Sequence, residues 1–204
     1  MYVPSHVVTN NDLTKYMETN DEWIQERTGI KERRYAHRTE ETTTTMGVEA
    51  AKIAIERAGI TPQDIDFIVF ATLSPDYYFP GCGVLLQRAM KMKQVGALDV
   101  RNQCSGFVYA LSVADQFIRS GMYKNILVVG GEIQSSALDK SDEGRSSAVI
   151  FADGAGAVVL SRTNSEKSGI LSTHLHADGD HAEHAEQQGN AGGELQFPTR
   201  RPCG

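Results

Sequence analysis

Long apolar runs are missing from this sequence, and its cysteines are few. The longest continuous apolar stretches, ILVVGG and FIVFA, are far shorter than the roughly 20 residues of a membrane-spanning helix. The three cysteines form neither a CxxC pair nor a disulfide framework, which argues against a zinc knuckle and against a cross-linked secreted domain. We therefore expect reduced thiols, no membrane partner and a cytoplasmic protein.

An excess of positive charge is missing as well. The chain has 20 Lys and Arg residues against 26 Asp and Glu residues, which gives a net charge of -6. Proteins that bind phosphate backbones carry clustered Lys and Arg, so nucleic acid is not expected as a partner. The apolar fraction, by contrast, is 40% of 204 residues, which is enough for a buried core in one or two domains.

Helix and strand patterns alternate from residue 46 to residue 132. In the first helix pattern Val48, Ala51 and Ile55 share one face, and a glycine follows as a stop. The strand patterns are continuous apolar runs, typical of strands buried on both faces. The expected elements are helices over 46–59, 83–92 and 105–121 and strands over 66–75, 97–100 and 125–132. This alternation predicts an α/β fold with a mixed, mainly parallel sheet and helices on both faces.

The flanking segments are less regular. Residues 153–163 and 169–178 resemble two strands separated by a polar turn, and we expect them to pair in antiparallel fashion. The first 45 residues contain two short helix patterns, each preceded by Asn or Asp.

Three domains follow from these patterns. We expect an N-terminal segment over 1–45, an α/β domain over 46–179 and a tail over 180–204. The tail is rich in His, Glu, Gln and Gly and has no usable period, so we expect it to be a loop or poorly ordered.

Cys104 stands between the strand pattern 97–100 and the helix pattern that follows it. Unpaired N–H groups at a helix N-terminus favour a thiolate, and the small residues Ser105 and Gly106 leave space beside the sulfur. Ligands of open α/β sheets bind at such strand-to-helix junctions. Free cysteine is also a common core residue, so the residues alone leave open whether Cys104 is a nucleophile or a small buried side chain.

Three motifs in order along the chain carry a family resemblance. They are NDEWIQERTGIKERR, DVRNQCSGFVYALSVADQFIRSG and IFADGAGAVVL, and the likeness continues through GILSTHLHADG to about residue 180. Together they resemble the β-ketoacyl-[acyl-carrier-protein] synthase III family of the thiolase superfamily. The resemblance implies a thiolase-like fold, of which this chain is one half of a duplicated structure.

The resemblance also implies a reaction. Family members initiate fatty acid synthesis by condensing an acyl-CoA primer with malonyl-acyl carrier protein through a cysteine thioester, with release of carbon dioxide. Cys104 takes the nucleophile's position, and its backbone N–H would contribute to an oxyanion hole. No cofactor is implied beyond coenzyme A as part of the substrate, and the full-length protein is expected to be a homodimer.

Four further site residues come from the same resemblance. Trp23, by stacking, and Arg27 would contact the adenine end of coenzyme A, Arg145 would be the second arginine there, and Phe79 would close the acyl tunnel across a dimer interface. Three of the four have a structural alternative. These are core packing for Trp23, an ion pair with Glu22 or Glu26 for Arg27, and anchoring of a loop beside Pro80 for Phe79.

Two other motifs invite different functions. The histidines and aspartates of residues 174–184 could form a metal site, because His174 and His176 would share one face of a strand; the alternative is a polar strand end and a solvated loop. Since this stretch is part of the family resemblance, which implies no metal, we favour the alternative and expect no metal site. GAGAVV lacks the GxGxxG spacing of a dinucleotide-binding loop, and we interpret its glycines as allowing close packing at a strand start.

The chain also departs from the family pattern. The family's catalytic His and Asn belong to a second half, and none of the six histidines here lies in a matching HQAN or HGNT context. The first strand, which we expect at the centre of the sheet, is missing before Tyr2. We therefore expect a fragment that is unstable in isolation.

Other functions stay open. One alternative is a related condensing enzyme that makes a quinolone, polyketide or long-chain ketone precursor, and another is a non-catalytic remnant that binds coenzyme A. A cysteine hydrolase would need a positioned base and a water-accessible acyl site, and the sequence indicates neither.

Overall fold

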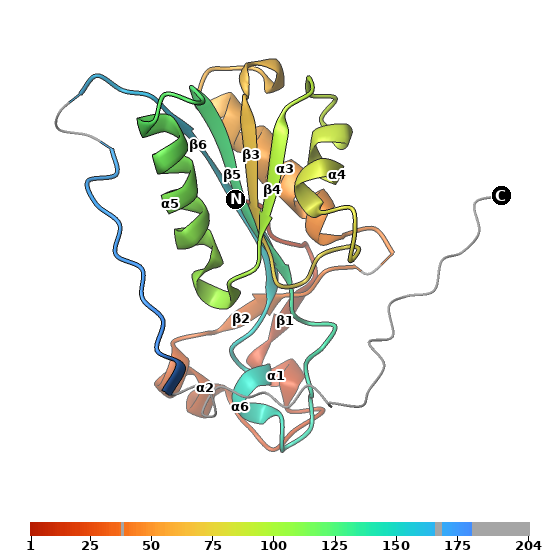
Figure 1. The fold of residues 1–204 in the computed structure, drawn as a ribbon. Coiled ribbons are helices and arrows are strands. Elements are labelled where there is room, and N and C mark those ends of the chain that lie inside the picture. The colour runs from red at the N-terminus through yellow and green to blue at the C-terminus, as the bar shows by residue number, and fades with distance from the viewer. Residues whose placement is uncertain (38, 166–168, 181–204) are drawn as a thin grey trace. The chain divides into compact units, whose positions relative to one another are not determined.

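The computed structural model describes residues 1–37, 39–165 and 169–180, and Figure 1 shows the chain as a ribbon. All helices and strands discussed below lie in residues 1–171, which form one compact unit. Their centre is a four-stranded sheet in the order β4-β3-β5-β6. The strands are β3 (Phe67–Ala71), β4 (Gly96–Val100), β5 (Asn125–Ile133) and β6 (Asp153–Ser161). Because β3 is parallel to β4 and β5 while β6 is antiparallel to β5, the predicted mixed, mainly parallel α/β sheet is confirmed.

Helices cover both faces of this sheet (Figure 1). The helices α3 (Thr43–Arg57) and α4 (Cys82–Ala89) pack on one face, and α5 (Gly106–Arg119) packs on the other. Successive strand residues point to opposite faces, so Phe70 contributes to the core under α3 and α4, whereas Val69 contributes to the core under α5. This double burial explains why the patterns of β3 and β5 are continuously apolar, whereas β4, at the edge of the sheet, is largely exposed.

The packing of α3 on the sheet is very close. A Cβ atom at Gly47 would lie 2.8 Å from the ring of Phe70, so only glycine allows the helix to approach this far. The position is fully helical, and its benefit is the close contact rather than backbone freedom.

The N-terminal segment forms a second, smaller layer of structure. It contains the antiparallel strands β1 (Val7–Thr9) and β2 (Glu32–Arg34) and the short helices α1 (Asn10–Leu13) and α2 (Asp21–Thr28). The two predicted short helices are confirmed. Asn20 caps α2 as predicted, whereas the cap of α1 is Thr9 rather than an Asn or Asp.

The core of this layer includes residues from much later in the chain. Ala148, the last residue of α6 (Arg145–Ala148), and Val149 are buried together with Leu13, Ile24 and other apolar side chains of the N-terminal segment. The segment between β5 and β6 is therefore packed against the first 40 residues. Figure 1 shows α1, α2 and α6 gathered beyond the carboxyl ends of β3, β4 and β5.

Two expectations about strands are wrong. Residues 169–178 form no strand, and β6 pairs with β5 instead. A strand before Tyr2 would not be central either, because β3 pairs directly with β5 and Tyr2 forms a bridge to Ala155 of β6, a strand at the edge of the four-stranded sheet. The predicted tail lies outside the described residues, except for its first residue.

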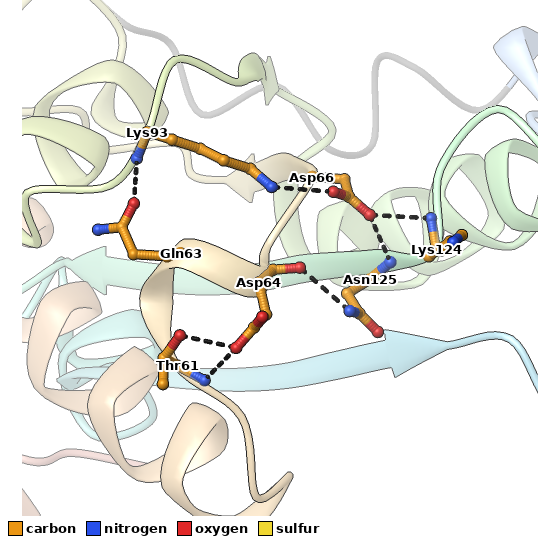
Figure 2. Close-up of polar contacts among 7 residues, drawn as sticks. All are labelled: Thr61, Gln63, Asp64, Asp66, Lys93, Lys124 and Asn125. Carbon is orange, nitrogen blue, oxygen red and sulfur yellow. Dashed lines mark hydrogen bonds and ion pairs between the residues drawn. The ribbon is translucent and has the colours of Figure 1, made fainter.

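A polar network fixes the amino ends of the strands (Figure 2). The carboxylate of Asp66, just before β3, accepts N–H bonds from Lys124 and Asn125 at the start of β5 and a bond from the Lys93 ammonium before β4. Three neighbouring strands are thus tied at one end. The strand pairings continue to the carboxyl ends of β3 and β4, where the candidate site lies.

Candidate functional site

Cys104 lies in a sharp turn between β4 and α5. The strand ends at Val100, residues Gln103–Ser105 form one turn of 3-10 helix, and α5 begins at Gly106. Gln103 has a φ angle of 43°, in the left-handed region that residues other than glycine rarely adopt. The cysteine that follows is exposed, so the alternative that Cys104 is a small core residue is wrong.

Local hydrogen bonds hold this turn in place. The hydroxyl of Ser105 donates to the carbonyl of Asn102, and the amide of Asn102 donates to the hydroxyl of Ser105, each over 3.0 Å. Gly106 is buried, and a Cβ there would lie 3.5 Å from Ala71 at the carboxyl end of β3. The thiol therefore stands at the carboxyl ends of two parallel strands and at the amino end of a 14-residue helix. Free N–H groups at such a helix end can stabilise an anion, whether a thiolate or the oxygen of a thioester under attack.

The other described cysteine has a different environment. Cys82 is buried at the start of α4, and its backbone N–H and that of Gly83 donate to the carboxylate of Asp99. Burial raises the pKa of the Cys82 thiol to about 11. Of the two described thiols, only Cys104 is accessible to a ligand.

Trp23, Arg27 and Arg145 lie together, although Arg145 is more than a hundred residues away in the chain. The guanidinium carbon of Arg27 is 4.5 Å from the centre of the Trp23 ring, and that of Arg145 is 4.9 Å from it. Both distances are within the range of cation–π attraction. The structure thus brings together the three side chains that the family resemblance assigned to the adenine end of coenzyme A.

The structural alternatives for these residues are partly true. Trp23 is half-buried and packs against the core of the N-terminal segment, and Arg27 lies 3.4 Å from the carboxylate of Glu26. Arg27 itself is exposed, so a surface ion pair of this kind contributes little and leaves its charge available.

The loop that carries Arg145 is attached to the segment that carries Trp23. The guanidinium of Arg145 donates to the carbonyl of Glu18 over 2.6 Å, and the backbone N–H of Glu18 donates to the carboxylate of Asp142. Neither Glu18 nor Asp142 was predicted from the sequence. No local pattern indicates them, because both are polar surface residues and 124 positions separate them.

Phe79 lies in the loop between β3 and α4 and is 81% exposed. The preceding residues Tyr77 and Tyr78 are also exposed, so three consecutive aromatic side chains reach the surface. The exposure argues against the alternative that Phe79 is packed as a loop anchor. Since β3 and β4 are parallel neighbours, this loop and the Cys104 turn leave the sheet at the same end.

The histidines do not have the arrangement that a metal site would have needed. His174 and His176 were expected on one face of a strand, but the residues around them form no strand, and His181 and His184 lie outside the described residues. Within the described part of the chain, no group of three or more His, Cys, Asp or Glu side chains could hold a metal ion. The same residues include no helix that is long and apolar enough to cross a membrane.

Comparison with known proteins gives a consistent result. A family model described as 3-oxoacyl-[acyl-carrier-protein (ACP)] synthase III matches residues 98–179. The β-ketoacyl-[acyl-carrier-protein] synthase III of Ehrlichia canis is 51% identical over 178 residues, which are 87% of this chain and 55% of that protein. That of Aquifex aeolicus is 50% identical over 88% of this chain and 56% of its own length.

Solved structures agree in fold. The crystal structure of the Aquifex aeolicus enzyme superposes with a TM-score of 0.83 and covers 88% of this chain. The synthase III of Thermus thermophilus superposes with a TM-score of 0.82 at 38% identity over 89% of this chain and 55% of that one. The chain spans about half the length of the relatives that it matches.

Proposed function

The chain belongs to the β-ketoacyl-[acyl-carrier-protein] synthase III family, and from this premise we propose that it carries the acyl-accepting half of a condensing enzyme that initiates fatty acid synthesis. One observation carries the proposal. Cys104 is exposed at the amino end of α5, where the matching family motif requires a nucleophile.

The first step is a transacylation. The sulfur of Cys104 attacks the carbonyl carbon of an acyl-CoA, the bond from that carbon to the coenzyme sulfur breaks, and the proton of the cysteine thiol passes to the departing coenzyme thiolate. The backbone N–H of Cys104, in the turn before α5, helps to stabilise the negative oxygen of the tetrahedral intermediate. The products are an acyl thioester on Cys104 and free coenzyme A.

Coenzyme recognition falls to the residues around Trp23. The indole ring offers a stacking surface for the adenine, and Arg27 and Arg145 supply positive charge for the phosphates beside it. This cluster and the Cys104 turn both lie toward the carboxyl end of the sheet, which supports a single extended coenzyme site (Figure 1).

The second step needs residues beyond those placed here. Malonyl-acyl carrier protein loses carbon dioxide, and the electron pair left on its α-carbon forms a bond to the acyl carbonyl carbon. The thioester bond to Cys104 breaks, and the departing thiolate takes up a proton from solvent to return the thiol. We assign no catalytic His or Asn to this step. Phe79 is proposed to close the acyl tunnel of a partner copy in a homodimer, and its exposure supports this role.

The cellular setting follows from the chemistry. A nucleophilic thiol must stay reduced, which fits a cytoplasmic location. The proposed reaction uses no cofactor other than the coenzyme A thioester, which is its substrate.

A second candidate is the priming step of polyketide synthesis. A priming β-ketosynthase of the R1128 polyketide pathway superposes with a TM-score of 0.76 at 35% identity over 80% of this chain. The relatives near 50% identity favour fatty acid synthesis. Comparing rates of acylation with acetyl-CoA and with longer acyl-CoA thioesters separates the two.

The first test is intact-mass spectrometry after incubation with acetyl-CoA. We expect one acetyl group on the wild-type chain and none on Cys104→Ser, whereas Cys82→Ser remains acetylated. A folded chain that binds coenzyme A without acylation would instead support the alternative of a non-catalytic coenzyme-binding protein. Acetylation that survives Cys104→Ser would contradict the proposed nucleophile.

A further inference from the structure

We propose that Asp142 is a positioning residue for the coenzyme site: it holds Arg145 over the ring of Trp23 without contacting the coenzyme itself. This inference rests on the proposed function, because it concerns how the same site is kept in shape.

The peptide of Glu18 is held from both ends by one short loop. Its N–H donates to the carboxylate of Asp142, and its carbonyl accepts a bond of 2.6 Å from Arg145. Asp142 and Arg145 are also joined directly, because the N–H of Arg145 donates to the carbonyl of Asp142. The loop and the segment before α2 therefore behave as one unit around Glu18.

Arg145 depends on this attachment for its position. Within the described residues its guanidinium forms no ion pair, and its hydrogen bond is to a backbone carbonyl that only the Glu18 segment provides. The helix that carries it has four residues and no side-chain N-cap. Ala148 and Val149 anchor the far side of that helix in the core, and Asp142 anchors the near side. Without the carboxylate of Asp142, the bond from Arg145 to Glu18 is the one remaining tie of these two between the loop and the Trp23 segment.

The loop from Asp139 to Arg145 folds back closely on itself. A Cβ atom at Gly144 would lie 2.1 Å from the carbonyl oxygen of Asp139, so the chain between Asp139 and Arg145 has little room to change shape. A shift at Asp142 is therefore passed on to Arg145 rather than absorbed between them.

The charge of Asp142 and its positioning role predict opposite changes in coenzyme binding when the residue is removed. As a carboxylate close to a site for an anionic coenzyme, Asp142 repels the phosphates, so its removal would strengthen binding if charge alone mattered. As the residue that holds Arg145 in place, its removal weakens binding. The sign of the effect therefore identifies the role.

Trp23 is the sole tryptophan of the chain, so its fluorescence reports on this site directly. Acrylamide quenching measures how well Trp23 is covered in the free protein, and titration with coenzyme A measures binding. The variants are Asp142→Ala, Asp142→Ser, Asp142→Asn and Arg145→Ala. Glu143→Ala is the matched control, because it removes the same charge from the same loop, and the carboxylate of Glu143 accepts a bond from the hydroxyl of Ser141 within the loop itself.

We expect Asp142→Ala and Asp142→Ser to make Trp23 more accessible to acrylamide, as Arg145→Ala does, and to weaken coenzyme binding about fivefold, which matches the loss of one ordinary hydrogen bond. Asp142→Asn keeps an acceptor and should stay within about twofold of wild type. Glu143→Ala should bind as tightly as wild type or more tightly.

The outcomes separate the two proposals. If wild type binds coenzyme A and Asp142→Ala and Asp142→Ser resemble Glu143→Ala in both measurements, the positioning role is wrong and the proposed function stands. If the wild-type protein does not bind coenzyme A, the coenzyme site and this inference are both wrong. This holds even if acrylamide quenching shows that Asp142 keeps Trp23 covered through Arg145. Since Asp142 is exposed, either truncation is expected to fold, and a thermal melt checks this.

Discussion

The guanidinium of Arg33 donates to the side-chain oxygen of Asn10 over 2.6 Å inside the N-terminal segment, where both residues are almost fully buried. Burial lowers the pKa of Arg33, and its other acceptors are the backbone carbonyls of Val8 and Val149. Through these bonds Arg33 connects strand β1 to the segment that carries α6. A buried cation held by neutral oxygens is sensitive to the loss of any one of them.

We therefore expect Asn10→Ala to lower the free energy of unfolding by about 2 to 3 kcal/mol, because the charged buried donor of Arg33 loses its side-chain acceptor. The bonds that the Asn10 amide donates to Asp21 and to the carbonyl of Ile30 are lost with it. Urea denaturation measures this. The neighbouring Asn11→Ala is the control, since Asn11 is exposed, and it should change stability by less than about 0.5 kcal/mol. Equal effects of the two variants would contradict the role of the Arg33–Asn10 contact.

A second prediction concerns the close approach of α3 to the sheet. Gly47→Ala places a methyl group 2.8 Å from the Phe70 ring and should cost about 1 to 3 kcal/mol through overpacking. Adding Phe70→Leu should make the double variant less destabilised than the sum of the two single variants. Gly156→Ala, where a Cβ meets nothing within 4 Å, is the control and should be close to neutral. Additive effects at positions 47 and 70 would count against this packing.

The two described cysteines should differ strongly in reactivity. At pH 8 the Cys82 thiol, with its pKa of about 11, is ionised to only about one part in a thousand, and it is also buried. In a Cys203→Ser background, iodoacetamide should modify Cys104 within minutes and Cys82 only after denaturation. Peptide mass mapping after a time course reads this out. Rapid alkylation of Cys82 in the folded chain would show that its environment is not as described.

Acid should weaken the network of Figure 2. Burial works to raise the pKa of Asp66, but bonds from the N–H groups of Asn125 and Lys124 and from Lys93 outweigh it and hold this pKa below its usual value. Because the folded-state pKa is the lower one, the stabilisation is complete above the unfolded value near 4 and is lost as the pH falls through the folded value.

Asp66→Asn should therefore reduce stability at pH 7 and flatten the decline of the melting temperature below pH 5. Melting curves between pH 3 and pH 7 measure both. The exposed replacement Glu56→Gln controls for the loss of one negative charge. A wild-type and an Asp66→Asn profile of the same slope in acid would rule out this contribution.

Local patterns were sufficient for much of this fold. The helix around Val48 and Ile55, the buried strand at Phe67–Ala71 and the place of Cys104 before a helix all follow from periodicity and from stop signals a few residues away. The strand predicted over 169–178 was wrong because a short polar and apolar alternation does not form a strand without a neighbour to pair with.

What the sequence by itself determined is the succession of helices and strands, the family motifs and the position of Cys104, since these depend on residues close together in the chain. Only the tertiary structure decided the order of the strands, the edge position of the segment at Tyr2, and the meeting of Trp23 with Arg145 through Glu18 and Asp142. The contacts of Tyr2 and of Trp23 join residues more than a hundred positions apart. Like the strand pairings, they form only when separate elements pack on a shared core, which no local pattern records.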